Sequence, residues 1–194
     1  MTSSLRWISA DLEAMPDDGK RYEIIDGELQ VSKQLHYYHQ LVCSATLALL
    51  RGWSKRTGLG SANLAPGLIF DDDEDVVPDV TWASNERLAL ALSKDGKLHA
   101  APELVVEVLS AGAKNERRDR QAKLKLYSRH GVAEYWILDW RSRNIEIYRR
   151  KEAQLELIAT SYEGDLLTSP LLPGFSCKVT EIFEDVPPVA ASSE

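Results

Sequence analysis

Runs of apolar residues alternate with polar segments along the chain and predict a mixture of strands and helices. Two strand-like runs, 21–26 and 28–32, flank Asp26-Gly27, a dipeptide that favours a tight hairpin turn. The longest helical pattern covers 36–56, where apolar residues recur on one face. Further helices are expected at 9–15 and 85–92, strands at 67–70 and 79–83, and one or two weaker strands within 154–160 and 166–180.

The centre of the chain carries the clearest pattern. Residues 103–110 form an almost continuous apolar, β-branched run, which is typical of a strand covered on both faces. A charged helix is expected at 115–130, a second buried strand at 134–139 and a more edge-like strand at 144–150. A strand, helix and strand in this order predict a right-handed parallel crossover. The fold class is therefore α/β (α+β), with a mixed central sheet flanked by helices.

Length and composition set the broad class of the protein. The 194 residues, 44% of them hydrophobic, are enough to bury a core, and we expect one domain at 1–186 with a flexible C-terminal tail at 187–194. No apolar run approaches the ~18 residues that span a bilayer, and no signal peptide is recognisable, which favours a cytoplasmic protein without membrane association. Cys43 and Cys177 are expected to be reduced, buried thiols. A net charge of −7 argues against nucleic acid covering the whole surface.

The most informative single residue is Glu107, which lies inside the central apolar run. Alternation along a strand places Val105, Glu107 and Leu109 on one face. Because a buried unpaired charge costs several kcal/mol, Glu107 should be ion-paired, protonated or bound to a metal. From this residue alone, a structural pair with an arginine and a functional role are equally good interpretations.

Two further positions gain meaning only together with Glu107. Asp79 follows Pro78, which favours the start of a strand, where an Asp is usually solvated or caps the chain. Asp119, Lys123 and Tyr127 follow i, i+4, i+8 spacing and share one helix face. The ordinary interpretation is a surface Asp119–Lys123 pair. The functional alternative turns Lys123 toward the carboxylates, because its helix directly follows the Glu107 strand.

Four segments of the chain resemble a known family. They are YEIIDGEL, VPDV, APELVVEVLS and RRDRQAKLKLYSRHGVAEYWILD. In this order and spacing, over residues 20–150, they resemble the Uma-two family of restriction endonuclease-like proteins in the PD-(D/E)XK nuclease superfamily. The resemblance implies a restriction endonuclease-like fold for the domain at 1–186 and the activity of a metal-dependent phosphodiesterase.

The resemblance also assigns roles to residues. Asp79 matches the Asp of the PD element and Glu107 the (D/E)XK carboxylate, whereas the usual lysine position two residues later holds Leu109. In such relatives the following helix is thought to supply the lysine, and Lys123 is the matching position. Glu28 matches a further acidic position of the site, although it can equally be a hairpin-edge carboxylate.

One histidine also matches the family. His39 aligns with a histidine common among its members, but a histidine near a helix start is more often a packing or capping residue.

The implied cofactor is Mg²⁺ or Mn²⁺, because phosphodiester hydrolysis needs an activated water and compensation of phosphate charge. Asp79, Glu107 and the carbonyl of Val108 would bind the metal, since hard cations prefer oxygen ligands. Lys123 would orient or deprotonate the water or offset phosphate charge, and Asp119 and Tyr127 would support it from the same helix face. DNA is the expected substrate, and cleavage of both strands by two sites would require a homodimer. The alternative is a non-catalytic relative that binds nucleic acid or protein.

The distribution of charge supports a local contact with nucleic acid. Residues 114–151 hold twelve basic and five acidic residues, a local net charge of +7. A groove that follows phosphates would have this composition, and so would a solvated charged helix. The residues expected to contact DNA are Arg117, Arg118, Arg120 and Lys125.

Overall fold

The structure is a computed structural model that describes residues 5–32 and 36–187. The helices in this part of the chain are α1 (Ser9–Leu12), α2 (Tyr37–Thr57), α3 (Asn85–Ala91), α4 (Ala113–Arg117), the π-helix η1 (Arg118–Lys123), α5 (Leu124–Arg129) and α6 (Val179–Phe183). The strands are β1 (Arg21–Ile25), β2 (Glu28–Ser32), β3 (Gly60–Leu64), β4 (Leu68–Asp71), β5 (Glu74–Val76), β6 (Val80–Ser84), β7 (Leu104–Val108), β8 (Glu134–Asp139), β9 (Asn144–Lys151), β10 (Gln154–Tyr162), β11 (Leu166–Thr168) and β12 (Ser176–Lys178).

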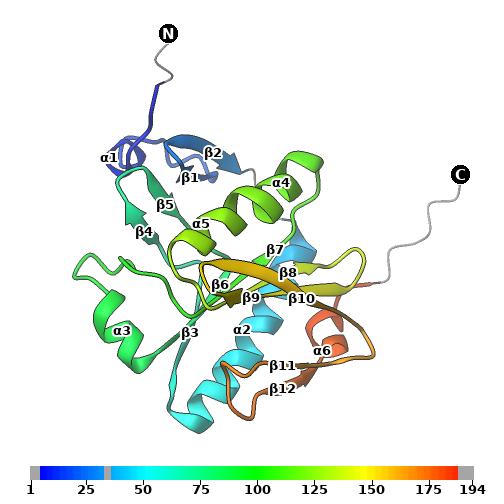
Figure 1. The fold of residues 1–194 in the computed structure, drawn as a ribbon. Coiled ribbons are helices and arrows are strands. Elements are labelled where there is room, and N and C mark those ends of the chain that lie inside the picture. The colour runs from blue at the N-terminus through cyan, green and yellow to red at the C-terminus, as the bar shows by residue number, and fades with distance from the viewer. Residues whose placement is uncertain (1–4, 33–35, 188–194) are drawn as a thin grey trace, which may run out of the picture.

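A six-stranded mixed sheet forms the centre of the molecule, in the order β10-β9-β8-β7-β6-β3 (Figure 1). The β7–β8 pair is parallel, and the other neighbours are antiparallel. The chain leaves β7, passes through α4, η1 and α5, and returns to β8, so the predicted crossover between parallel strands is confirmed. The predicted fold class, a mixed central sheet flanked by helices, is confirmed as well.

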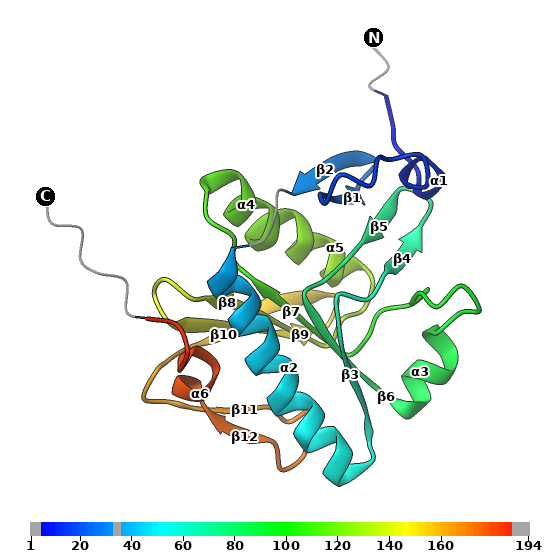
Figure 2. The same cartoon turned by 180° about the vertical axis from the view of Figure 1, so that it is seen from behind.

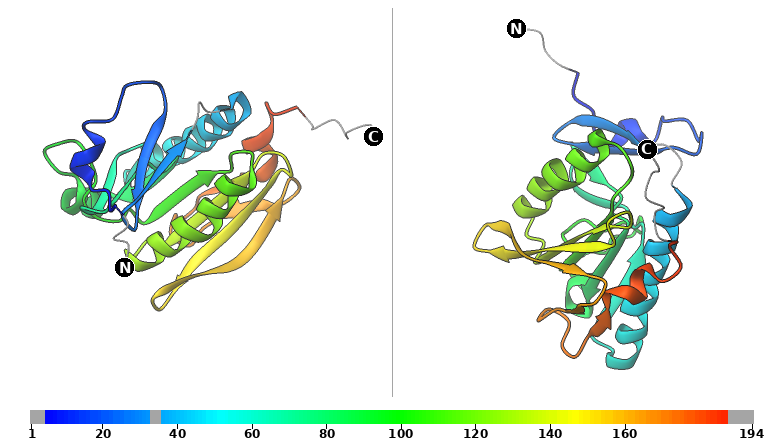
Figure 3. Two further views of the ribbon diagram at one scale, coloured as in Figure 1. Left: turned by 90° about the horizontal axis from the view of Figure 1, so that it is seen from above. Right: turned by 90° about the vertical axis from the view of Figure 1, so that its right-hand side faces the viewer.

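Helices cover both faces of this sheet (Figures 2 and 3). Leu104, Val106 and Val108 of β7 pack in a core cluster with residues of α2 and α6. Val105 and Leu109 pack in a second cluster with Leu126 and Tyr127 of α5. All five residues of β7 are buried, as expected for a strand covered on both sides. Glu107 therefore faces the helix that carries Lys123.

A second sheet has four strands in the order β2-β1-β5-β4 and lies beside α5 at the top of Figure 1. It contains the predicted hairpin, with Arg21 opposite Ser32 and Ile25 opposite Glu28. The acidic residues 71–75 supply the end of β4, the turn at 72–73 and the start of β5. The strand β5 pairs with β1 through Ile24 and Asp75, which ties the N-terminal hairpin to the segment just before Asp79.

Several predicted elements differ in extent. The helix expected at 9–15 spans only Ser9–Leu12, and the one expected at 115–130 begins at Ala113 and contains a π-helical segment. The strand β3 was not predicted, because its sequence GSANL is polar and glycine-containing. Residues 188–194 of the predicted tail lie outside the described residues. In the described parts of the chain, no helix has both the length and the apolar character needed to cross a bilayer.

Candidate active site

Asp79 and Glu107 meet on adjacent strands. Asp79 directly precedes β6, Glu107 lies in β7, and the antiparallel register pairs Val80 with Val106. The backbone N–H of Val108 donates to Oδ2 of Asp79 at 2.9 Å. Both carboxylates are buried, with 4% of Asp79 and 1% of Glu107 exposed. Two acids 28 positions apart in the sequence are thus brought together by strand pairing.

Lys123 reaches the same place from the helix that follows β7. Its Nζ lies 2.8 Å from Oε1 of Glu107 and 3.0 Å from Oε1 of Glu23, and none of the residue is exposed. The hydroxyl of Tyr127 donates to Oε1 of Glu107 at 2.7 Å. Asp119 is also fully buried, and its carboxylate accepts from Nε of Arg118 at 2.8 Å. The structure therefore places Asp119, Lys123 and Tyr127 on one inward face.

The π-helical segment Arg118–Lys123 explains how these three side chains stay in line. In an α-helix of about 3.6 residues per turn, positions i, i+4 and i+8 drift progressively around the axis. The wider π turn between Asp119 and Lys123 rotates in the opposite sense and offsets the drift that follows in α5. Short π segments occur frequently at functional sites, where they redirect side chains in this way.

Glu23 of β1 is a member of the cluster that the sequence did not reveal. Its Oε1 accepts from the N–H of Val77 at 2.9 Å and from Lys123, while its buried Oε2 has no hydrogen-bond partner. Glu28, the expected acidic residue of this hairpin, is exposed at the start of β2, opposite Ile25. It makes no hydrogen bond or ion pair with the cluster among the described residues. The local signal was weak, because Glu23 shares its strand face with the polar Arg21 as well as with Ile25.

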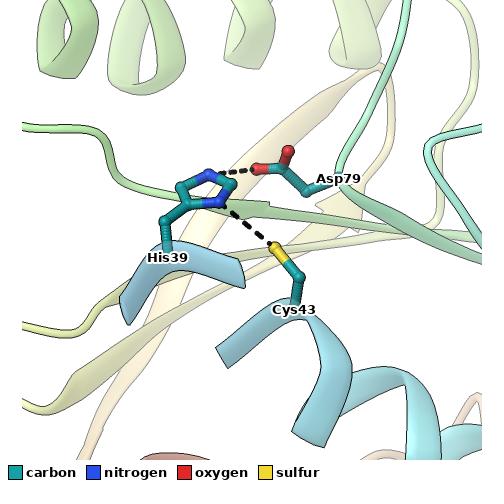
Figure 4. Close-up of side chains that lie close together, drawn as sticks. All are labelled: His39, Cys43 and Asp79. Atoms are coloured by element: carbon teal, nitrogen blue, oxygen red, sulfur yellow. Dashed lines mark hydrogen bonds and ion pairs between the residues drawn. The ribbon is translucent and has the colours of Figure 1, made fainter. Parts of the chain in front are cut away.

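Asp79 has further partners on its other side. Nη1 of Arg21 lies 3.1 Å from Oδ1, and Nε2 of His39 lies 3.2 Å from Oδ2. Figure 4 shows the imidazole of His39 between Asp79 and Cys43, whose Sγ is 3.5 Å from Nδ1. The N-cap of α2 is His36, which accepts from the N–H of Tyr38 at 3.2 Å. His39 is thus neither a cap nor a simple packing residue, because it contacts an acid of the candidate site.

The pKa values of Asp79 and Glu107 are shifted in opposite directions. Burial raises the pKa of Glu107 to about 8, with the nearby carboxylates adding to the effect of desolvation. Burial also acts on Asp79, but the hydrogen bond from His39 and the charge of Arg21 hold the pKa of Asp79 well below its usual range. Burial opposes the charge of Lys123, yet Glu107 and Glu23 outweigh it and raise the pKa of Lys123. Lys123 is therefore a cation at neutral pH.

The donor set of the cluster is rich in carboxylates. Within the described segments, the cluster holds four acids and three basic side chains in addition to His39. The acids are Glu23, Asp79, Glu107 and Asp119, and the basic side chains are Arg21, Arg118 and Lys123. When all four acids are ionised, the cluster carries a surplus negative charge. Oxygen donors with surplus negative charge suit a hard divalent cation.

The basic segment at 114–151 is largely neutralised inside the molecule. Arg118 pairs with Asp119 and donates to Oγ of Ser32 at 2.7 Å, and Arg120 pairs with Glu146. Other arginines of the segment pair with acids in the same way, namely Arg129 with Glu74, Arg141 with Asp139, Arg143 with Glu163 and Arg149 with Glu134. Of the four expected DNA contacts, Arg117 and Lys125 are exposed, and neither forms an ion pair within 5–32 and 36–187.

A family model and one solved structure agree with this architecture. The family model Uma2, described as "Putative restriction endonuclease", matches residues 9–180. A crystal structure titled as "a putative nuclease belonging to DUF820" from Anabaena variabilis ATCC 29413 is similar at a TM-score of 0.72 and 17% identity, covering 91% of this chain and 97% of that one. The type IIG restriction endonuclease BpuSI aligns at a TM-score of 0.41 and 13% identity, over 79% of this chain and 16% of the other. No curated protein matches the sequence.

Proposed function

The chain belongs to the Uma2 family of restriction endonuclease-like proteins, and from that premise we propose that it is a divalent-metal-dependent nuclease that hydrolyses phosphodiester bonds in DNA. The observation that carries the proposal is the convergence of Asp79, Glu107 and Lys123 in one buried cluster. Asp79 directly precedes β6, Glu107 lies in the neighbouring strand β7, and Lys123 comes from the helical segment between β7 and β8. Two acids and a lysine, drawn together from distant segments, are the groups that metal-assisted phosphodiester hydrolysis requires.

The cluster fits a hard divalent cation. Asp79 and Glu107 would bind Mg²⁺ or Mn²⁺, with the carbonyl of Val108 as a further oxygen ligand beside them. The buried, unpartnered Oε2 of Glu23 supports this fit, because a buried carboxylate oxygen without a hydrogen bond is costly unless a cation or water satisfies it. When bound, the ion would activate a water molecule and offset the charge that develops on the phosphate.

The remaining residues have roles that follow from their protonation and contacts. Because the pKa of Lys123 is raised, Lys123 acts as a fixed positive charge toward the phosphate and not as a base. Burial and the neighbouring Glu107 raise the pKa of Tyr127 well above its ordinary value, so its hydroxyl keeps its proton and holds Glu107 in place. Asp119 holds Arg118 against the cluster.

Access to the site passes along its arginines. The side chains of Arg21 and Arg118 are 21% and 12% exposed, whereas Glu107 and Lys123 are closed to solvent. A DNA phosphate that approaches these guanidinium groups would gain charge-assisted hydrogen bonds. Cutting both strands would use two such sites, for which a homodimer is the simplest assembly.

The direct test is nicking of supercoiled plasmid by the full chain with Mg²⁺ or Mn²⁺. Asp79→Ala and Glu107→Ala should each lower the rate by about 100-fold or more, because each removes a metal ligand. Glu23→Gln should lower it about tenfold, and the exposed Glu28→Gln serves as the matched control that leaves it unchanged. Equal cleavage by the wild type and both alanine variants would identify a contaminant and refute the site.

A second candidate function is a non-catalytic member of the fold that binds nucleic acid or protein. The observation that favours it is that both oxygens of Asp79 already have partners, namely Arg21 on one and His39 with the Val108 N–H on the other. Titration with Mn²⁺ separates the two functions through linkage between binding and stability. A rise in Tm supports the nuclease, whereas an unchanged Tm up to millimolar Mn²⁺ supports the non-catalytic protein.

A further inference from the structure

A group of side chains with different donor chemistry adjoins the carboxylate cluster. His39 and Cys43 stand one turn apart on the inward face of α2, and Asp79 faces them from the segment before β6 (Figure 4). One imidazole nitrogen, the thiol sulfur and one carboxylate oxygen all lie within 4.8 Å of one another. All three residues are buried, with 1%, 2% and 4% exposed. We propose that His39, Cys43 and Asp79 form a binding site for Zn²⁺ that shares Asp79 with the hard-cation site.

The donor atoms lie near one another, although somewhat farther apart than in a formed zinc site. Zinc bonds of about 2.0–2.3 Å to nitrogen, oxygen and sulfur place tetrahedral ligands about 3.3–3.7 Å apart. Here one donor atom from each residue lies within 4.8 Å of the other two. The imidazole lies between the other two groups, with Nδ1 3.5 Å from Sγ of Cys43 and Nε2 3.2 Å from Oδ2 of Asp79. Binding of an ion would require the imidazole to rotate so that one nitrogen faces a common centre.

The donor set also selects the metal. A thiolate, an imidazole and a carboxylate suit Zn²⁺ or Co²⁺, whereas Mg²⁺ takes oxygen ligands and does not take thiolate. Three protein ligands leave a fourth position for water, as in open zinc sites. Another grouping, Asp71, Glu74 and His130, contains no sulfur, and its Glu74 already pairs with Arg129 and His130. The sulfur of Cys43 therefore distinguishes the two groupings experimentally.

Proton balance is simple at this site. Asp79 only accepts, so Nε2–H of the neutral imidazole donates to it and Nδ1 accepts from the Cys43 thiol. Binding of Zn²⁺ forms a zinc–sulfur bond and releases the thiol proton to solvent, while the imidazole keeps one proton on the nitrogen that faces away from the ion. A bound Zn²⁺ would use the Asp79 carboxylate and would therefore compete for it with Mg²⁺ or Mn²⁺. This competition rests on the proposed function, whereas the zinc site itself does not.

The test uses Co²⁺ as a spectroscopic probe for the zinc site, on the full chain without a histidine tag. Co²⁺ bound to a thiolate gives a sulfur-to-cobalt charge-transfer band in the near ultraviolet, and Zn²⁺ should abolish that band by displacement. The chain has two cysteines, so Cys177→Ser is the matched control for Cys43→Ser. We expect the band in the wild type and in Cys177→Ser, and its loss in Cys43→Ser.

Affinity gives an independent reading. Cys43→Ser and His39→Gln should each weaken Zn²⁺ binding by about tenfold or more against a competing chelator, because each removes one ligand. Two variants are used so that a folding defect in one leaves the other informative. Absence of the band in the wild type, its survival in Cys43→Ser, or its loss in Cys177→Ser alone would overturn the proposal. A band without nuclease activity refutes the proposed function and not the zinc site, whereas nuclease activity without a band refutes only the zinc site.

Discussion

At the scale of single residues, the site depends on how buried charges compensate one another. The ammonium group of Lys123 contacts both Glu107 and Glu23, and this pairing matters because an unpaired buried charge costs several kcal/mol. The pKa of Glu107 is nevertheless raised, which shows that Lys123 does not fully compensate for the burial of its charge. Under the proposed function, Glu107 serves to bind the metal and not to stabilise the fold.

The raised pKa predicts how stability depends on pH. Unfolded Glu107 ionises near its ordinary value of 4.5, whereas in the folded chain burial raises its pKa to about 8. Between these values the folded state binds more protons than the unfolded state, so this contribution to stability is present below pH 4.5 and is lost as pH rises to about 8. Glu107→Gln removes that loss, because glutamine does not ionise. The difference in free energy of unfolding, variant minus wild type, should therefore increase by at least about 1 kcal/mol from pH 5 to pH 8.

Urea denaturation in EDTA at the two pH values measures this difference. The exposed Glu28→Gln controls for the loss of one negative charge. A difference between Glu107→Gln and the wild type that stays constant from pH 5 to pH 8 would contradict the prediction. A large loss of stability in Glu107→Gln would indicate a structural ion pair instead.

Residue patterns predicted part of this site. The apolar neighbours of Glu107 identified it as a buried acid, and the spacing of Asp119, Lys123 and Tyr127 correctly grouped them on one face. The contribution of Glu23 depends on the pairing of β1 with β5, which brings Val77 and Glu23 together. That contact is between segments 54 residues apart, and local sequence carries no information on it.

At the scale of elements, β7 was predictable and β3 was not, for one physical reason. Strand β7 is buried on both faces and its sequence is apolar throughout, whereas most residues of β3 are exposed and its pairing with β6 is decided by the partner strand. The π-helical segment has no sequence signature either, and its Asp119 and Lys123 are buried inside the molecule. Elements defined by tertiary pairing are therefore the ones that sequence reasoning missed.

The β3–β6 pair leads to a test of how the sheet supports Asp79. A Cβ at Gly60 of β3 would lie 2.2 Å from the carbonyl oxygen of Ala83 and 2.8 Å from the Trp82 ring. Gly60→Ala should therefore destabilise the fold by about 1–3 kcal/mol, since the clash with backbone cannot be relieved by a side-chain rotation. Gly164→Ala is the matched control, because nothing lies within 4 Å of its Cβ. Thermal unfolding of both variants checks this, and equal Tm values would show that β3 does not pack closely on β6.

At the scale of the whole molecule, charge that is segregated along the sequence is largely paired in space. The segment 114–151 has a net charge of +7, yet most of its described arginines pair with acids. Arg120 and Arg149 pair with Glu146 and Glu134 of the same segment, whereas Arg129 and Arg143 pair with Glu74 and Glu163 outside it. The excess of basic residues in this segment therefore does not produce a long basic surface. If the proposed function is right, we expect contact with DNA to be concentrated on the exposed Arg117 and Lys125 beside the more buried Arg118.

DNA binding should therefore depend on few basic residues. The double variant Arg117→Ala/Lys125→Ala should weaken binding and lower the slope of log K against log salt by about 2, because two phosphate contacts are lost. Fluorescence anisotropy with a short duplex in EDTA measures binding without cleavage. Arg51→Ala/Lys55→Ala is the matched control, since these exposed residues lie on α2 across the sheet. Equal slopes for the two double variants would place the DNA elsewhere.

We propose that Asp79 and Glu107 together bind the divalent metal of a nuclease. A crystal structure of the wild type soaked with Mn²⁺, with diffraction recorded at the manganese absorption edge, tests this binding. We expect an anomalous peak in contact with both carboxylates, and its loss in Asp79→Asn. A peak that avoids these two residues, or no peak at saturating Mn²⁺, would show that they do not bind the metal.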